Sequence, residues 1–210
     1  MKLKNKTLHL AIIALSVMAT VAACSEAGNK ETATKKEDIT ELRQKEKEEL
    51  VARGRYLVTV AGCNDCHSPK VMTPMGPMPD TTKLMSGYPS EHGIPTLTEA
   101  LAKDQQWVKM SPDVTTFAGP WGISFGANLT PDETTGIGNW TEEVFVKTLR
   151  TGKHLGQEGG RPVMPPMPWY NVAKMTDEDL SAVYSYLMSL PAIKNPVPAP
   201  IPPTEIKVVK

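Results

Sequence analysis

The distribution of apolar and polar positions divides the chain into an apolar beginning, a polar stretch and a long region with helical periods. Residues 8–23 form an apolar run that follows three lysines, and residues 25–40 are polar without an apolar period. The run is shorter than the ~20 residues that a membrane-spanning helix needs, so it is typical of an export signal. We predict a signal peptide over residues 1–23 and a flexible tether over residues 24–40.

The pattern becomes helical from about Thr40, where acidic and basic residues alternate at spacings that stabilise a helix. The helix is expected to end at Gly62, because glycine often follows the last helical residue. Its apolar face is formed by Leu50, Val51, Leu57 and Val58. The pattern therefore predicts one long helix that leads directly to Cys63.

Two later helices have recognisable ends. Thr141 precedes a helical period that ends at Gly152, and acidic residues fill the first turn, where they favour a helix start. Thr176 begins the clearest helical period of the chain, which ends at Leu190 before a proline. The apolar stripe of this last helix is formed by Leu180, Val183, Tyr184 and Leu187.

The region between the first helix and Thr141 is predicted to consist mostly of loop. Nine of the 19 prolines fall between residues 68 and 140, and they interrupt any long element. A short helix is expected around residues 98–110. We interpret part of residues 70–125 as an inserted, ordered loop, because the aromatic residues that it contains favour burial. The proline-rich residues 191–203 are expected to be extended.

The composition suits a soluble globular protein, with 40% apolar and 22% charged residues. Aromatic residues make up only 6%, which leaves room in the core for a large apolar ligand. Without residues 1–23, which hold three lysines and no acidic residue, 20 basic residues remain against 23 acidic ones. This small negative charge gives no reason to expect a nucleic-acid partner.

Three cysteines are present, at positions 24, 63 and 66. Residues Val21–Cys24 resemble the lipobox of bacterial lipoproteins, in which the cysteine is acylated and becomes the first mature residue. The alternative is an ordinary cleaved signal followed by an incidental cysteine. We favour lipidation of Cys24. The protein would then be exported and anchored to a membrane, facing the periplasm or the outer surface.

The segment Cys63-Asn64-Asp65-Cys66-His67 matches the C-x-x-C-H pattern of c-type haem attachment. The thiols of Cys63 and Cys66 would bond covalently to two vinyl groups at one edge of a haem. His67 would then lie beneath the iron as its proximal axial ligand. The motif therefore predicts one covalently bound haem c.

Other interpretations of the motif are less consistent with its surroundings. A thioredoxin-like pair uses C-x-x-C between a strand and a helix, whereas here a helix precedes the motif. A structural zinc site needs two more ligands, and His67, His92 and His154 lack the usual paired spacing. A chance match to so short a pattern is the third alternative. Export and the preceding helix favour haem.

The second axial ligand would be a methionine or a histidine. Met164 and Met167 lie in a proline-rich stretch, residues 161–169, just before the last helix. Met167 is favoured as the distal ligand, because prolines flank it on both sides and an aromatic ring follows; Met164 is the fallback. His92 and His154 are expected to be exposed loop residues. Three further methionines are too near the motif to reach the opposite haem face: Met72, Met75 and Met78.

Several of these segments together resemble a class I cytochrome c. They are Gly54–Leu57, the haem motif, the Met-Pro stretch and the final helix at 177–190. More narrowly, four motifs are similar to those of bacterial cytochromes related to the cytochrome subunits of membrane alcohol dehydrogenases. They lie at 119–122, 128–132, 135–141 and 165–169. The last of these supports Met167 over Met164. Such subunits carry several haem motifs, and this chain has one.

The resemblance implies an all-α fold of the class I cytochrome c type, in which helices surround one covalently bound haem and long ordered loops connect them. The cytochrome domain would span residues 41–192, and residues 193–210 would form a proline-rich tail. The first helix would cross the last one. Gly54 would let the two backbones approach closely, with Tyr184 or Leu187 packing over it.

The expected function is electron transfer by a membrane-tethered carrier in an exported respiratory or dehydrogenase-linked chain. Such a carrier has no catalytic residues of its own and is not an enzyme. Its partners would be redox proteins, namely a membrane dehydrogenase, an oxidase or a soluble cytochrome, besides the membrane that holds its lipid. The alternative is a haem enzyme or gas sensor with an open distal site, for which residues 70–125 would form the pocket.

Overall fold

The computed structural model describes residues 39–104 and 106–209. The predicted signal peptide, Cys24 and the tether up to residue 38 lie outside the described residues. The chain divides into two units, Met1–Glu48 and Glu49–Lys210. In the first unit the described residues 39–48 are helical, and in the second unit residues 49–60 are helical. Within the described ranges, no helix has the length and apolar character needed to cross a membrane.

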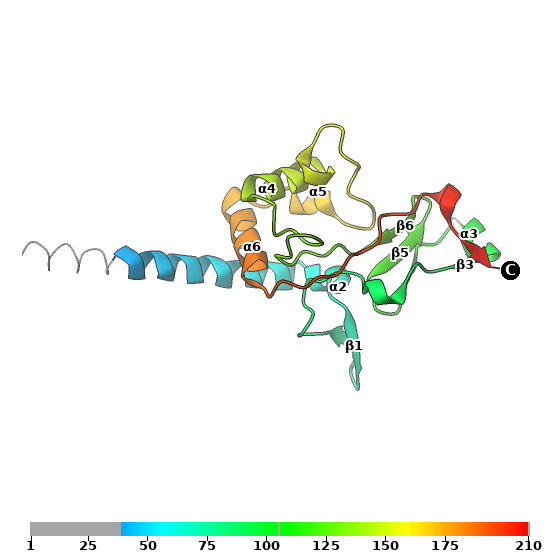
Figure 1. Cartoon of the computed structure of the whole chain (residues 1–210), viewed down its shortest axis with the longest axis horizontal. Coiled ribbons are helices and arrows are strands. Elements are labelled where there is room, and N and C mark those ends of the chain that lie inside the picture. Colours follow the sequence, from blue (N-terminus) through cyan, green and yellow to red (C-terminus); the bar gives the residue numbers. More distant parts are fainter. Residues whose placement is uncertain (1–38, 105, 210) are drawn as a thin grey trace, which may run out of the picture. The chain divides into compact units, whose positions relative to one another are not determined.

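The second unit contains the other predicted helices (Figure 1). Helix α4 spans Glu142–Thr151; its N-cap Thr141 accepts a hydrogen bond from Val144 N, and Gly152 ends it in a left-handed conformation. Helix α6 spans Asp177–Ser189, and its N-cap Thr176 accepts from Asp179 N. Both predictions are confirmed, including their caps. Shorter helices are α2 (Cys63–His67), α3 (Glu99–Lys103) and α5 (Trp169–Val172).

Three small sheets accompany the helices, and the sequence did not predict them. Strands β1 (Lys70–Thr73) and β2 (Gly76–Pro79) form an antiparallel hairpin. Strands β4 (Lys109–Met110), β5 (Thr116–Gly119) and β6 (Gly122–Phe125) form an antiparallel sheet. Strand β3 (Leu97–Thr98) pairs in parallel with β7 (Val208–Val209). Strands of two to four residues are too short to show an alternating pattern.

The segment predicted as a helix over 98–110 contains α3 alone, followed by β4. The helix ends at Lys103 because Asp104 adopts an extended conformation. Three single 3₁₀ turns complete the description: Ser90–His92, His154–Gly156 and Pro203–Glu205.

The core lies where residues 49–60 meet α4 and α6. Its buried apolar side chains are Leu57, Val58, Met85, Ile137, Phe145, Ala182, Val183, Tyr186 and Leu187. The predicted crossing of the first and last helices is confirmed at Gly54. A Cβ atom there would lie 1.9 Å from Ala182 O and 2.8 Å from Tyr186 Cβ. The neighbours are thus Ala182 and Tyr186, and not the expected Tyr184 or Leu187. Tyr184 instead donates its hydroxyl to Trp140 O, at 2.7 Å.

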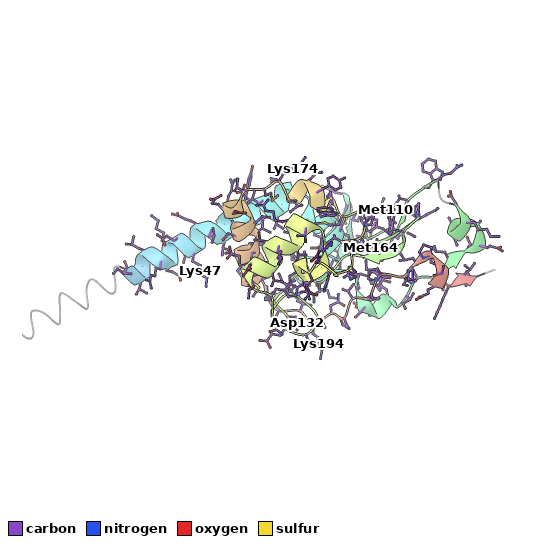
Figure 2. All side chains as sticks on the ribbon, turned by 90° about the horizontal axis from the view of Figure 1, so that it is seen from above. Lys47, Met110, Asp132, Met164, Lys174 and Lys194 are labelled. Atoms are coloured by element: carbon purple, nitrogen blue, oxygen red, sulfur yellow. The ribbon has the colours of Figure 1, made fainter. Side chains whose placement is uncertain are left out.

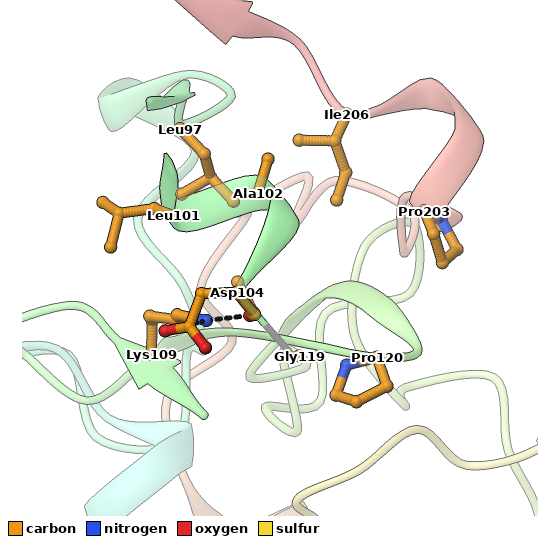
Figure 3. A pocket seen from close by; sticks show the side chains of 10 residues that line it. Leu97, Leu101, Ala102, Asp104, Lys109, Gly119, Pro120, Pro203 and Ile206 are labelled. Atoms are coloured by element: carbon orange, nitrogen blue, oxygen red, sulfur yellow. Dashed lines mark hydrogen bonds and ion pairs between the residues drawn. The ribbon is translucent and has the colours of Figure 1, made fainter. Parts of the chain in front are cut away.

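The C-terminal segment after α6 is extended, as predicted, and it is bound to the rest of the unit. Asn195 donates to Ser86 O at 2.6 Å and to Tyr88 O at 2.8 Å. Ile201 pairs with Ile123 of β6. Near the end of the segment, a small pocket of about 40 Å³ lies between α3, β5 and residues 203–206 (Figure 3). Gly119 and Pro120 of the motif at 119–122 line it, whereas no candidate haem or iron ligand does.

Candidate haem site

The C-x-x-C-H motif folds as the single turn of helix α2. Gly62 precedes it with φ 69°, a left-handed conformation that ends the first helix and that glycine adopts readily. Residues three and four apart lie on the same helix face, so Cys63, Cys66 and His67 share one face of α2. Both thiols are free and half-buried. The two sulfurs and the imidazole are therefore presented together.

Burial keeps both thiols protonated at neutral pH. It raises the pKa of Cys63 to about 11, and it also raises the pKa of Cys66, with the charge of Asp65 acting in the same direction. A thioredoxin-like pair needs the opposite, a thiol whose pKa is lowered so that the thiolate can attack. The surroundings of Cys63 and Cys66 therefore do not favour thiol–disulfide exchange.

The side chain of His67 has a fixed partner. Its Nδ1 lies 2.9 Å from Ala127 O. Because a carbonyl oxygen can only accept, Nδ1 carries the hydrogen and Nε2 carries the lone pair. Burial lowers the pKa of His67, so the imidazole is neutral at pH 7. A neutral histidine whose second nitrogen is held by a carbonyl is the usual arrangement of a metal-ligating imidazole.

Backbone contacts hold α2 against two loops. Gly87 N donates to His67 O at 2.8 Å, and Tyr88 N donates to Gly126 O at 2.9 Å. A Cβ atom on Gly126 would lie 2.0 Å from Cys66 O, so only glycine allows this approach. The buried Ser68 donates to Asn64 Oδ1 at 2.9 Å. The motif is thus packed directly on residues 85–88 and 126–127.

Lys70, the first residue of β1, reaches back to α2. Its Nζ donates to Asn64 O at 3.1 Å, to Asp65 O at 2.9 Å and to Ser68 O at 2.6 Å. Burial lowers the pKa of Lys70, while the nearby carboxylates of Asp65 and Asp113 act in the opposite direction. A cation at this position interacts favourably with the carbonyl end of a helix.

The two candidate distal ligands lie in one turn of the loop between α4 and α5, where Figure 2 labels Met164. Met167 N donates to Met164 O at 3.2 Å, and both side chains are half-buried. The ring of Trp169 packs over Gly152, where a Cβ atom would lie 2.4 Å from it. The structure thus holds Met164 and Met167 in one ordered turn.

Strand β6 and the residues after it contact both halves of the candidate site. Ser124 Oγ donates to Pro165 O at 2.5 Å, within the methionine loop. Three residues later, Ala127 O accepts from His67. The structure therefore brings the motif and the methionine loop to the same short segment, residues 124–127.

The remaining candidates lie elsewhere. His92 is exposed, as predicted, and contacts the edge of Tyr88. His154 is half-buried rather than exposed, because its ring packs edge-on against Trp140. The hairpin methionines are exposed: Met72, Met75 and Met78. Within residues 39–104 and 106–209, no group of three or more His, Cys, Asp or Glu side chains is arranged to hold a metal ion.

Sequence reasoning missed three residues around the motif. Ala127 acts through its carbonyl oxygen, so its residue type gives no signal. Ser124 contacts a loop 41 positions away, and nothing in the sequence indicates that pairing. Lys70 had a usable signal, because a basic residue shortly after a helix often binds its last carbonyls.

No family model matches the chain. Similar proteins are found among curated cytochrome subunits of dehydrogenases. The chain is 31% identical over 139 residues to the gluconate 2-dehydrogenase cytochrome c subunit of Pantoea cypripedii, covering 66% of this chain and 23% of that protein. It is 30% identical over 156 residues to the fructose dehydrogenase cytochrome subunit of Gluconobacter japonicus, covering 74% and 24%.

A third relative is the cytochrome c subunit of the quinone-dependent alcohol dehydrogenase of Gluconobacter oxydans, 28% identical over 141 residues, covering 67% of this chain and 21% of that protein. The chain thus spans about a quarter of the length of the curated relatives it matches. These similarities support a cytochrome c related to dehydrogenase cytochrome subunits, and they imply haem c as its cofactor.

Proposed function

We propose that this chain is a membrane-tethered, monohaem cytochrome c of class I that transfers electrons in an exported, dehydrogenase-linked chain. The observation that supports this most directly is the hydrogen bond between His67 Nδ1 and Ala127 O, at 2.9 Å. It leaves Nε2 as the free ligand atom of a neutral imidazole. Few other roles require that arrangement next to two free thiols on the same helix face.

The residues present fit a c-type haem. Cys63 and Cys66 would hold it covalently, His67 would be the proximal ligand, and Met167, with Met164 as the fallback, would be the distal ligand. When bound, the haem supplies an iron that changes its oxidation state by one electron. The protein's own part is to fix the tautomer of His67 through Ala127 and, before the haem is attached, to keep the two thiols protonated so that they do not exchange with disulfides.

The proposed partners are redox proteins: a membrane dehydrogenase as donor, and an oxidase or a soluble cytochrome as acceptor. The names of the relatives support the dehydrogenase as a partner. Lipid on Cys24 would confine the carrier to a membrane surface facing the periplasm or the outside. Tethering raises the effective concentration of one protein near another without any new contact.

Covalent haem attachment is the first experiment. The full chain is expressed in a bacterium that matures c-type cytochromes, denatured, separated by electrophoresis and stained for haem. We expect a haem-stained band that is lost when Cys63 and Cys66 are replaced by serine. Absence of stain in the unmodified protein would overturn the proposal. Rapid carbon monoxide binding to the reduced, untreated protein would favour an enzyme or gas sensor with an open distal site instead.

Membrane tethering needs its own test. The Cys24→Ser variant is expected to move from the membrane fraction to the soluble periplasmic fraction, still carrying haem. If this variant stays with the membrane fraction after a salt wash, Cys24 is not the anchor. That result would leave the haem assignment unaffected, because the two rest on different residues.

A further inference from the structure

The last four carbonyl groups of a helix have no partner within the helix. In α2 these belong to Asn64, Asp65, Cys66 and His67. Asn64 O accepts from Ser68 N at 3.3 Å, and His67 O accepts from Gly87 N at 2.8 Å. Lys70 Nζ donates to the carbonyl oxygen of Asp65 and gives the carbonyl oxygen of Asn64 a second hydrogen bond. The side chain of Lys70 thus binds two of the four carbonyl groups at the end of the helix from which His67 projects.

Lys70 uses all three hydrogens of its ammonium group in this way. The third goes to Ser68 O, at 2.6 Å. The backbone of Lys70 is fixed as well, because it pairs with Pro79 at the base of the β1–β2 hairpin. The ammonium group of a lysine is strongly hydrated on an open surface. Here it instead contacts three backbone carbonyl oxygens at the end of α2.

We propose that Lys70 is a positioning residue of the haem site. It stabilises the helical conformation of α2, so that His67 retains its hydrogen bond to Ala127 O, and it places a fixed positive charge beside the motif. This inference rests on the proposed function. A single-turn helix has little stability of its own, since its first turn costs more than one hydrogen bond returns. The three bonds from Lys70 supply the stabilisation that so short a helix lacks.

The charge of Lys70 has a predictable effect on the redox equilibrium. The oxidised site carries one more positive charge than the reduced site, so a nearby cation disfavours oxidation. Asp65 and Asp113 lie close enough to act on the ammonium of Lys70, and they offset part of this effect. Removal of the ammonium alone is therefore expected to lower the midpoint potential.

The test uses the haem-loaded full chain and three variants. Lys70→Met removes the charge and the donors, Lys70→Arg keeps both, and Lys83→Met is the matched control. Lys83 also carries a positive charge, but its Nζ pairs with Glu91 at 3.3 Å and both side chains are about half exposed. Two readouts are compared, the midpoint potential from a spectroscopic redox titration and the hydrogen exchange of the amides of residues 64–68.

We expect Lys70→Met to shift the ratio of reduced to oxidised protein at a fixed potential by roughly threefold or more toward the oxidised form. Amide exchange at residues 64–68 should become faster in the same variant. Lys70→Arg should restore most of both effects, and Lys83→Met should change neither. If haem is lost from Lys70→Met but retained in Lys70→Arg, the positioning role is supported; loss in both variants would contradict it.

The inference fails if Lys70→Met carries haem and matches the unmodified protein in both readouts, or if Lys83→Met changes the potential equally. These results differ from a failure of the proposed function, in which the unmodified chain binds no haem. Amide exchange at residues 64–68 would still report on Lys70 in that case.

Discussion

The backbone of Gly54 lies directly against the carbonyl group of Ala182, so close that a Cβ atom on Gly54 would come within 1.9 Å of the oxygen. The contact joins the first helix to α6. Both helices contribute side chains to the core, against which Cys63 of the candidate haem motif also packs. It makes residue 54 a position at which volume, and not polarity, decides stability.

Replacement of Gly54 by alanine should therefore destabilise the protein, although alanine favours helices. We expect a loss of about 1–3 kcal/mol, because the added methyl group must displace backbone in a packed interior. Gly159→Ala is the matched control, since nothing lies within 4 Å of a Cβ atom there. Denaturant unfolding monitored by circular dichroism measures both; equal midpoints would show that the helices separate without cost.

Replacement of Met167 by leucine should remove the proposed distal ligand while nearly conserving side-chain volume. The oxidised protein should lose the weak far-red absorption band that reports methionine sulfur bound to iron, and its midpoint potential should fall. Met164→Leu should retain the band. The reverse outcome would assign the ligand to Met164, and retention of the band in both variants would exclude this loop.

Two methionines of the β1–β2 hairpin, Met72 and Met75, should be oxidised by peroxide well before the buried Met85. Met72 and Met75 are 78% and 86% exposed, whereas Met85 is 1% exposed. Each exposed thioether takes one oxygen atom from hydrogen peroxide, which leaves water. Peptide mass spectrometry after brief treatment should find sulfoxide at Met72 and Met75 while Met85 is intact. Equal oxidation of Met85 would mean that its loop opens readily.

Replacement of Asn195 by alanine should be costly. Its side chain donates to Ser86 O and Tyr88 O and accepts from Ser90 N at 3.0 Å, all in a nearly buried setting. Loss of these partners leaves backbone groups unpaired, for which we expect about 2–4 kcal/mol. The control is Asn139→Ala, which removes an exposed side chain that donates to Glu133 O. Similar unfolding midpoints for the two variants would contradict this account.

The sequence predicted the parts of the structure that depend on local pattern. The caps at Thr141 and Thr176 follow from residue type and spacing, and the structure contains them. The close approach at Gly54 was implied by the resemblance to class I cytochromes c, and the structure contains it too. It did not predict the strands between residues 70 and 125, because they are short and their prolines suggest loops. It also did not predict the bond from His67 to Ala127, since a backbone oxygen 60 residues away leaves no trace in the sequence.

The binding of the C-terminal segment has a consequence for how the protein is made. Within residues 86–90, Gly87 N donates to the carbonyl oxygen of His67. The same segment is hydrogen-bonded to Asn195, which lies 105 to 109 positions later in the chain. During synthesis Asn195 emerges long after the cysteines of the motif. The residues that pack around His67 can therefore reach their final arrangement only when synthesis is nearly complete. Until then both thiols remain accessible for the proposed haem attachment.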